Sequence, residues 1–472
     1  MRTINAAGFV IAVALLAGCT VGPDYHRPTV QAPTSWKMDS YWQPSIPNHA
    51  PLQLDWWRIF DDTTLGALEK QALANNQTLQ AANAHYLQAR ESLTITASAA
   101  LPTVSVSSGL ARNKISGQRP VLNYATPSES TVQNDVSLRT GFSYELDLFG
   151  NVRRDIEAAQ AAVEQSADDL ANARLVLTAN LATDYWAMRE LDDEIDVIQK
   201  SVDLQHQALR FVIKRHNLGI VSGLDVAQQR SQLDASRTQS ALLLKQRAQY
   251  EHAISALIGA AAPDFTLPVQ TVTIPVPRIT LDVPSTLLQR RPDIAAAERA
   301  MAESNARIGI ATSAYFPDVQ LSPSIGWESV RFASMLSAPS LMWSLGSSAT
   351  QVLFDGGKRR AGINYAKQDY VAAQANYRQT VLDAFRQVQD AVTGLSELDD
   401  AANQSHAAVV DAQQLLTLAN KRYVGGLAEF LDVISAQQQM LTNRRQEIQI
   451  RGQQAALVVY LVQALGGGWA AS

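Results

Sequence analysis

Two long stretches of the chain carry apolar residues at every seventh position. In the first, these positions run from Ile156 to Val212 and are polar only at Asp184 and Gln205. In the second, they run from Val381 to Tyr423 without a break. A sustained heptad pattern predicts long helices that pack against neighbouring helices as in a coiled coil. A glycine-containing turn and a second apolar-rich stretch follow each one, so we expect helical hairpins over residues 151–258 and 357–465.

Other segments alternate apolar and polar residues with a period of two. From Val132 to Leu148 the even-numbered positions are mostly apolar, whereas the odd-numbered ones are small, polar or charged. Similar alternation covers residues 319–327 and, more weakly, 102–112 and 341–353. It predicts β-hairpins over about residues 102–149 and 317–355, each with one apolar face. Half-buried strands of soluble proteins alternate in the same way, so the pattern alone does not say whether the apolar face meets lipid.

The two halves of the chain repeat each other. Glu190-Leu191-Asp192-Asp193 recurs 207 positions further on as Glu397-Leu398-Asp399-Asp400. At the same displacement, Arg215, Gly219 and Leu224-Asp225-Val226 recur as Arg422, Gly426 and Leu431-Asp432-Val433. Matches in the same order predict an internal tandem duplication. We expect a first repeat over residues 62–265, a proline-rich linker over 266–284, a second repeat over 285–466 and a C-terminal tail over 467–472.

The N-terminus has the form of a targeting signal. A positive start is followed by a small and apolar run from Ala6 to Ala17, which is too short to cross a membrane as a helix. The run ends in Leu16-Ala17-Gly18-Cys19, and Cys19 is the only cysteine of the chain. This ending resembles the lipobox of bacterial lipoproteins. It predicts removal of residues 1–18, acylation of Cys19 and a lipidated strap over residues 19–61, and the following Thr20 favours the outer membrane.

Composition narrows the function classes. The chain has 472 residues, of which 46% are apolar, and a net charge of −5, which argues against both a disordered protein and a dedicated nucleic-acid binder. Seven histidines and one cysteine leave little material for a metal site. Because no nucleophile–base set or phosphate loop is apparent, we expect neither a cofactor nor an enzyme. The two Glu-Leu-Asp-Asp segments are expected to form solvated helix faces.

The predicted strands require more than one chain. Four strands are too few for a closed transmembrane barrel, which needs at least about eight, and open strand edges in lipid are costly. Two, three or four copies would supply roughly 8, 12 or 16 strands, and the count alone does not choose between them.

An ordered set of short motifs resembles the TolC-type outer membrane factors, in their lipoprotein (OprM/NodT-like) branch. Besides the lipobox, the motifs are Trp56-Trp57-Arg58-Ile59-Phe60-Asp61-Asp62, Asn75-Asn76-Gln77-Thr78-Leu79, Tyr144-Glu145-Leu146-Asp147-Leu148-Phe149-Gly150, Leu353-Phe354-Asp355-Gly356-Gly357, Arg422-Tyr423 and Ala464-Leu465-Gly466-Gly467-Gly468-Trp469. The resemblance implies a mixed α+β membrane protein. In this homotrimer, four strands per chain form a transmembrane β-barrel, and the long helices form a coiled-coil α-helical barrel across the periplasm.

The same resemblance implies the function and the site. The family serves as the exit duct of tripartite efflux systems, and it receives substrates from an inner-membrane pump, here of the RND type, through a periplasmic adaptor protein. An exit duct for type I protein secretion and a structural outer-membrane tether are the alternatives. By resemblance, the periplasmic gate comprises Arg422, Tyr423, Leu431 and Asp432, and the tip turns that contact the adaptor contain Gly219, Leu224, Asp225 and Gly426. Where the family has a further acid one turn on, this chain has Ser435.

Overall fold

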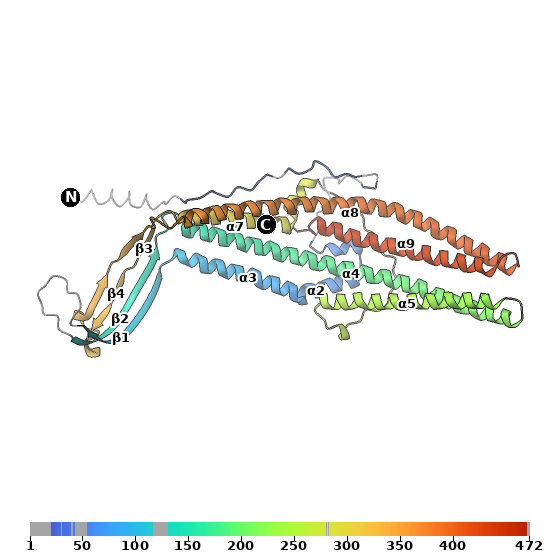
Figure 1. Cartoon of the computed structure of the whole chain (residues 1–472), viewed down its shortest axis with the longest axis horizontal. Coiled ribbons are helices and arrows are strands. Elements are labelled where there is room, and N and C mark those ends of the chain that lie inside the picture. The colour runs from blue at the N-terminus through green and yellow to red at the C-terminus, as the bar shows by residue number, and fades with distance from the viewer. Residues whose placement is uncertain are drawn as a thin grey trace. The chain divides into compact units, whose positions relative to one another are not determined.

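The structure is a computed structural model that describes residues 20–29, 31–38, 41–42, 54–116, 131–279, 281 and 283–469. Among these residues, no helix combines the length and the apolar character needed to cross a membrane. The helices and strands are α2 (Thr63–Asn75), α3 (Gln77–Ala97), β1 (Thr103–Ile115), β2 (Thr131–Glu145), α4 (Asn151–Asn217), α5 (Gly223–Leu257), α6 (Leu287–Arg290), α7 (Pro292–Ser313), β3 (Asp318–Leu321), β4 (Ser324–Ser329), β5 (Leu341–Ser344), β6 (Ser347–Thr350), α8 (Lys358–Val424) and α9 (Phe430–Ala464) (Figure 1).

The helices show the duplication directly. Helices α4 and α8 each have 67 residues, and α5 and α9 each have 35. The predicted helical hairpins are therefore present, with ends within a few residues of those expected from the glycine positions. Residues 265–279, which fall in the predicted linker, contain neither helix nor strand.

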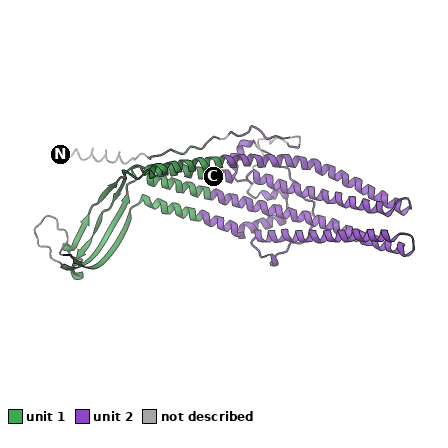
Figure 2. Ribbon diagram, in the orientation of Figure 1, with its two compact units in different colours: residues 1–28, 87–166, 297–377 green, residues 29–86, 167–296, 378–472 purple. Residues whose placement is uncertain are grey.

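The chain divides into two compact units, and both repeats contribute to each of them. Unit 1 comprises residues 1–28, 87–166 and 297–377, whereas unit 2 comprises residues 29–86, 167–296 and 378–472 (Figure 2). The strands all belong to unit 1. Both helix-to-helix turns of the long hairpins belong to unit 2.

Unit 1 contains an antiparallel sheet with the strand order β5-β4-β2-β3-β6, and β1 pairs with β2 outside this path. The β1–β2 hairpin is regular from Thr103 opposite Ser143 to Ile115 opposite Thr131. The second hairpin differs from the prediction, because each of its two expected strands is interrupted. Pro323 separates β3 from β4 since proline has no N–H for a ladder bond, and Leu345-Gly346 separates β5 from β6. The gap is bridged by the Ser322 N–H, which donates to the Gly346 carbonyl at 2.8 Å.

The strand register places the alternating apolar residues on one face of the sheet. Leu110 lies opposite Val136, Leu138 opposite Trp327, and Ile325 opposite Trp343. Many of these apolar side chains are exposed in the single chain, with Leu110 at 82% and Trp343 at 68% exposed. The opposite face is polar and carries the ion pair between Arg139 and Glu328 at 2.5 Å. The sheet therefore has the two chemically distinct faces that the alternation predicted.

The first described residues after Cys19 pack against unit 1 as an irregular strap. The Val21 N–H donates to the Phe149 carbonyl at 3.1 Å, and the buried Arg154 guanidinium pairs with Asp24 at 2.7 Å. Further along, in unit 2, two tryptophan side chains of the strap are part of the core. Trp36 and Trp42 are buried, and the Trp42 indole N–H donates to the Val392 carbonyl at 3.0 Å.

The core of unit 2 is made by the predicted heptad positions. Leu191, Ile198 and Val212 of α4 are almost completely buried, as are Val381, Val388 and Leu395 of α8. Gln205, a polar residue in the heptad pattern of α4, is also buried. Its amide donates to Ser201 Oγ at 3.1 Å, and its backbone carbonyl accepts from Gln229 of α5 at 3.1 Å. Gln205 thus belongs to a polar layer between α4 and α5, in which the Oε1 atoms of Gln205 and Gln229 have no hydrogen-bond partner among the described residues.

The first Glu-Leu-Asp-Asp segment is not solvated, contrary to the prediction. Asp192 is fully buried and pairs with Arg189 at 2.7 Å and with Arg247 at 2.6 Å. The same cluster holds the segment after α5, since Asp192 accepts from the Gln270 N–H at 3.1 Å and Arg247 donates to the Leu267 carbonyl at 2.8 Å. The second copy, by contrast, is partly to fully exposed at Glu397, Asp399 and Asp400. Two segments with one sequence therefore have different roles, because only the first is covered by the linker.

Candidate functional site

The two long hairpins of unit 2 reverse direction in turns of the same geometry. Gly219 and Gly426 have φ angles of 73° and 72°, which favour glycine. Around Gly219, the Ile220 N–H donates to the Arg215 carbonyl, and the Gly219 N–H to the His216 carbonyl, both at 2.9 Å. The bonds around Gly426 follow the same pattern. Both turns are therefore Schellman motifs, in which glycine ends a helix and the last carbonyls are satisfied.

The returning helices also begin in the same way. Ser222 and Asp225 form a capping box at the start of α5, and Glu429 and Asp432 form the equivalent box at the start of α9. In the second box, Asp432 Oδ2 accepts from the Glu429 N–H at 3.3 Å. The repeated aspartate thus has a local structural role, because it satisfies an N–H at the helix start. The leucines that precede these aspartates have no such capping role. The exposed fraction is 66% for Leu224 and 50% for Leu431.

One side-chain contact joins the tips of the two hairpins. The Arg215 guanidinium of α4 donates from Nη1 to the Tyr423 hydroxyl of α8 at 2.8 Å, and it lies 5.2 Å from the centre of the Tyr423 ring. The Tyr423 ring lies 5.3 Å from that of Phe430. Beneath this contact, residues of both hairpins share an apolar cluster: Val212, Ala419, Phe430, Val433 and Ala436, with Val221, Val226, Leu416, Tyr423 and Ile434 packed against it.

The predicted gate residues lie close together in the structure. Tyr423, Leu431 and Asp432 all lie at the tip of the α8–α9 hairpin. Arg422 is exposed there, and its guanidinium donates to the Leu427 carbonyl of its own turn at 3.3 Å. Within one chain, the arginine that reaches the neighbouring hairpin is Arg215. The sequence did carry a signal for it, since Arg215 is the repeat counterpart of Arg422.

A second polar contact joins the hairpins farther from the tips. Glu194 of α4 accepts from Arg445 of α9 at 3.0 and 2.9 Å and from Gln449 at 2.6 Å. Glu190 lies one turn away, against the backbone of Gly452. Burial, with a smaller effect from Glu194, raises the pKa of Glu190 to about 8. The α4–α9 contact therefore contains one paired carboxylate and one carboxyl whose raised pKa favours the protonated form.

Cys19 lies outside the described residues, but its neighbour has a defined place. Thr20 packs against Gly150, where an added Cβ would lie 2.9 Å from Thr20 Cα. Gly150, with a φ of 81°, directly precedes α4 and ends the short segment that links β2 to this helix. Thr20 is thus held at the junction of the sheet and the helices of unit 1.

Comparison with known proteins identifies the class. A family model described as "Outer membrane efflux protein" matches the chain twice, over residues 68–260 and 283–467. The toluene efflux pump outer membrane protein TtgF of Pseudomonas putida is 28% identical over 461 residues, which cover 96% of this chain and 95% of that protein. The pyoverdine export outer membrane protein OpmQ of Pseudomonas aeruginosa is 27% identical, and the match covers 98% of this chain and 96% of that protein.

Solved structures share the fold over almost the whole chain. The outer-membrane channel OprN has a TM-score of 0.88 at 29% identity, and the match covers 96% of this chain and 100% of that chain. The CmeC outer membrane channel of Campylobacter jejuni has a TM-score of 0.88 at 24% identity, with 96% of both chains covered, and shows likeness of fold.

The fold and these matches define a TolC-like channel protein of the outer membrane, built from two tandem copies of one unit. The chain belongs to the outer membrane efflux protein family. It is an efflux channel rather than an enzyme, and the predicted resemblance to the OprM/NodT-like efflux proteins is confirmed.

Proposed function

We propose that three copies of this chain form the exit duct of a tripartite efflux system. An RND-type inner-membrane pump supplies the substrates, and a periplasmic adaptor protein couples the pump to the duct. The observation that carries this proposal is the pair of duplicated helical hairpins, which end in matched turns and are joined at their tips by Arg215 and Tyr423. If the two hairpins move apart at this contact, the entrance between them opens, so the contact acts as a gate. The toluene and pyoverdine named for the relatives differ too much to indicate one substrate.

Unpaired strand edges support the assembly. Among the described residues, β1 pairs only with β2, and β5 pairs only with β4. Each therefore has one edge whose N–H and C=O groups lack a strand partner, a costly state in lipid. Pairing β1 with an edge of the next chain removes these edges and closes a barrel whose apolar face meets lipid.

The gate we propose combines an apolar and an acidic ring at the α8–α9 tip. Leu431 and Asp432 are both exposed in the single chain. In a trimer, three copies of each approach the axis. The leucines narrow the entrance, and the aspartates attract cations. The turns at Gly219 and Gly426, with Leu224 and Asp225 beside the first, form the surface that the adaptor engages.

A lipid anchor on Cys19 completes the proposal. Because Thr20 is held at the junction of sheet and helices, acyl chains on Cys19 start beside the sheet. Cys19→Ser should abolish labelling by radioactive palmitate while leaving the trimer intact, since the barrel also holds the protein in the membrane. Retention of residues 1–18 on the purified protein would contradict this part of the proposal.

Conductance in planar lipid bilayers tests the duct and its gate. The wild-type protein should give small current steps, Leu431→Ser larger ones, and Asp432→Asn a reduced preference for cations. Asn can still accept the Glu429 N–H, so this change removes the charge with little effect on the cap. Asp225→Asn is the matched control, because Asp225 makes the same cap on the other hairpin. A protein without any current would be a tether rather than a duct, and equal effects of both Asn variants would place the acidic ring elsewhere.

A further inference from the structure

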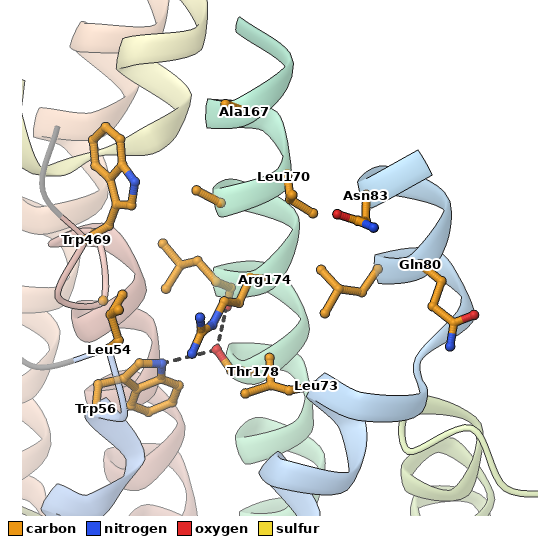
Figure 3. Close-up of a pocket in the computed structure, with 15 residues that line it drawn as sticks. Leu54, Trp56, Leu73, Gln80, Asn83, Ala167, Leu170, Arg174, Thr178 and Trp469 are labelled. Atoms are coloured by element: carbon orange, nitrogen blue, oxygen red, sulfur yellow. Dashed lines mark hydrogen bonds between the residues drawn. The ribbon is translucent and has the colours of Figure 1, made fainter. Parts of the chain in front are cut away.

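Unit 2 contains a cavity of about 830 Å³ that the proposed export function does not use. It lies between α3 and α4, and the segment around Trp56 and the residues after α9 complete its walls (Figure 3). Its volume is in the range of pockets that enclose a ligand of drug size. The cavity is formed within one chain, so it exists whether or not the assembly described above is correct.

Three of the sequence motifs meet at this cavity. Trp56 comes from the first motif, Leu79 from the second, and Gly466, Gly467 and Trp469 from the C-terminal one. The Trp56 indole N–H donates to Thr178 Oγ1 of α4 at 3.1 Å, which fixes one wall (Figure 3). Gly467 has a φ of 56°, and a Cβ there would collide with Leu175. The walls are thus held in place before any ligand binds.

The lining is largely apolar and carries a single charge. Leu73, Leu170 and Trp469 contribute to the apolar walls, and among the described residues Arg174 of α4 is the only charged one in the lining. In Figure 3 the Arg174 side chain reaches from α4 toward Leu54 and Trp56. Arg174 is half-buried, and its guanidinium has no hydrogen-bond or ion-pair partner within the described part of the chain. The other arginines buried in unit 2, Arg189, Arg247 and Arg291, all have carboxylate partners.

We propose that this cavity binds an aliphatic monocarboxylate, with its carboxylate on Arg174 and its hydrocarbon chain along the apolar walls. The planar guanidinium fork matches the two oxygens of a carboxylate. One cation balances one negative charge, so a doubly charged phosphate head would be left partly uncompensated. The amides of Gln80 and Asn83 also line the cavity, but they lie on α3, across the cavity from the Arg174 guanidinium (Figure 3).

Binding of decanoate, with decanol as its uncharged analogue, tests the proposal. The full chain in lipid nanodiscs is dialysed against each radiolabelled compound, and binding to empty nanodiscs is subtracted. We expect saturable binding of decanoate, about ten-fold tighter than that of decanol, because a hydrogen bond to a charged partner is lost in the alcohol. Affinity should rise about four-fold for each added methylene from octanoate to dodecanoate.

Variants separate the head group from the tail. Arg174→Gln should weaken decanoate binding about ten-fold and leave decanol unchanged, whereas Arg174→Lys should keep part of the preference. Ala171→Trp fills the cavity and should abolish binding of both compounds. Arg58→Gln is the matched control, since Arg58 is an exposed arginine paired with Asp55 and does not line the cavity.

Two results would overturn the proposal. One is decanoate binding no tighter than decanol to the wild-type protein. The other is a decanoate affinity that Arg174→Gln leaves unchanged, which would show that the anion does not contact this arginine. Neither result depends on channel conductance, so this site and the exit duct succeed or fail separately.

Discussion

Breaking the tip contact between Arg215 and Tyr423 should open the channel. The change Arg215→Ala removes a hydrogen bond from a charged donor, which typically contributes about 1.5–3 kcal/mol, and a cation–π contact that adds about 0.5 kcal/mol at an exposed site. Both side chains are partly exposed, so we take about 2 kcal/mol per chain. Because about 1.4 kcal/mol corresponds to a factor of ten, the equilibrium between joined and parted hairpins should shift roughly 30-fold toward the parted state.

Tyr423→Phe divides this effect into its components. It removes the hydroxyl acceptor but keeps the ring against Phe430 and beneath Arg215, so we expect a smaller shift of about ten-fold. The double variant should add little to Arg215→Ala alone, since the two residues act through one contact. Single-channel recording in planar bilayers measures the shift as open probability.

Arg210→Ala provides the matched control for this series. Arg210 lies on the same helix with the same charge, but its guanidinium contacts His206 of α4 itself at 2.6 Å. This change should leave open probability unaltered. The gating role of the tip contact would be refuted if Arg215→Ala behaved like the wild type, or if Arg210→Ala raised open probability to the same extent.

Three further predictions concern stability and insertion. Among the described residues, the fully buried Glu69 carboxyl has no hydrogen-bond partner, and burial raises its pKa to about 9. Because this folded-state pKa exceeds the unfolded value of about 4.5, raising the pH from 5 to 9 should destabilise the wild type relative to Glu69→Gln by on the order of 5 kcal/mol, measured by thermal unfolding. Asp192→Ala leaves the buried Arg189 without a carboxylate partner and Arg247 with Glu251 alone, and it should cost about 3–5 kcal/mol of stability. Asp399→Ala at the half-exposed repeat position should cost less than about 1 kcal/mol. Leu138→Asp on the apolar sheet face should make the free energy of membrane insertion less favourable by about 2 kcal/mol, whereas Ser137→Asp should not. The fraction of protein recovered in the outer membrane measures this effect.

Local signals explain why the helices were predictable. Gly219 and Gly426 end α4 and α8 in Schellman turns, and the heptad positions of both helices are apolar except at Asp184 and Gln205. These features act over one or two helical turns, so they can be read without knowing what lies next to the helix. The apolar face of the sheet was predictable for the same reason, because alternation is a property of consecutive residues. The interruption at Pro323 was also visible in the sequence, but the alternation on both sides of it masked the break.

Contacts between distant segments were not predictable in this way. The Glu-Leu-Asp-Asp segments have the same four residues, yet Asp192 is buried whereas Asp399 is half-exposed, because the linker crosses the Asp192 face of α4 and bonds to that carboxylate. The internal repeat indicated both Arg215 and Arg422, but it did not predict which of the two contacts the neighbouring hairpin. The cavity beside Arg174 likewise needs four separate segments of the chain, residues 54–56, 73–83, 167–178 and 466–469.

The sequence by itself therefore determined the duplication, the two kinds of element, the family and the residues at the tips. Each of these depends on periodicity or on motifs of a few residues, whose physical cause is local backbone geometry and the side on which apolar groups fall. The tertiary structure alone decided which charges are paired and which are buried. Pairing and burial depend on the segments brought together from distant parts of the chain, and identical local sequences such as the two Glu-Leu-Asp-Asp segments carry no record of their different neighbours.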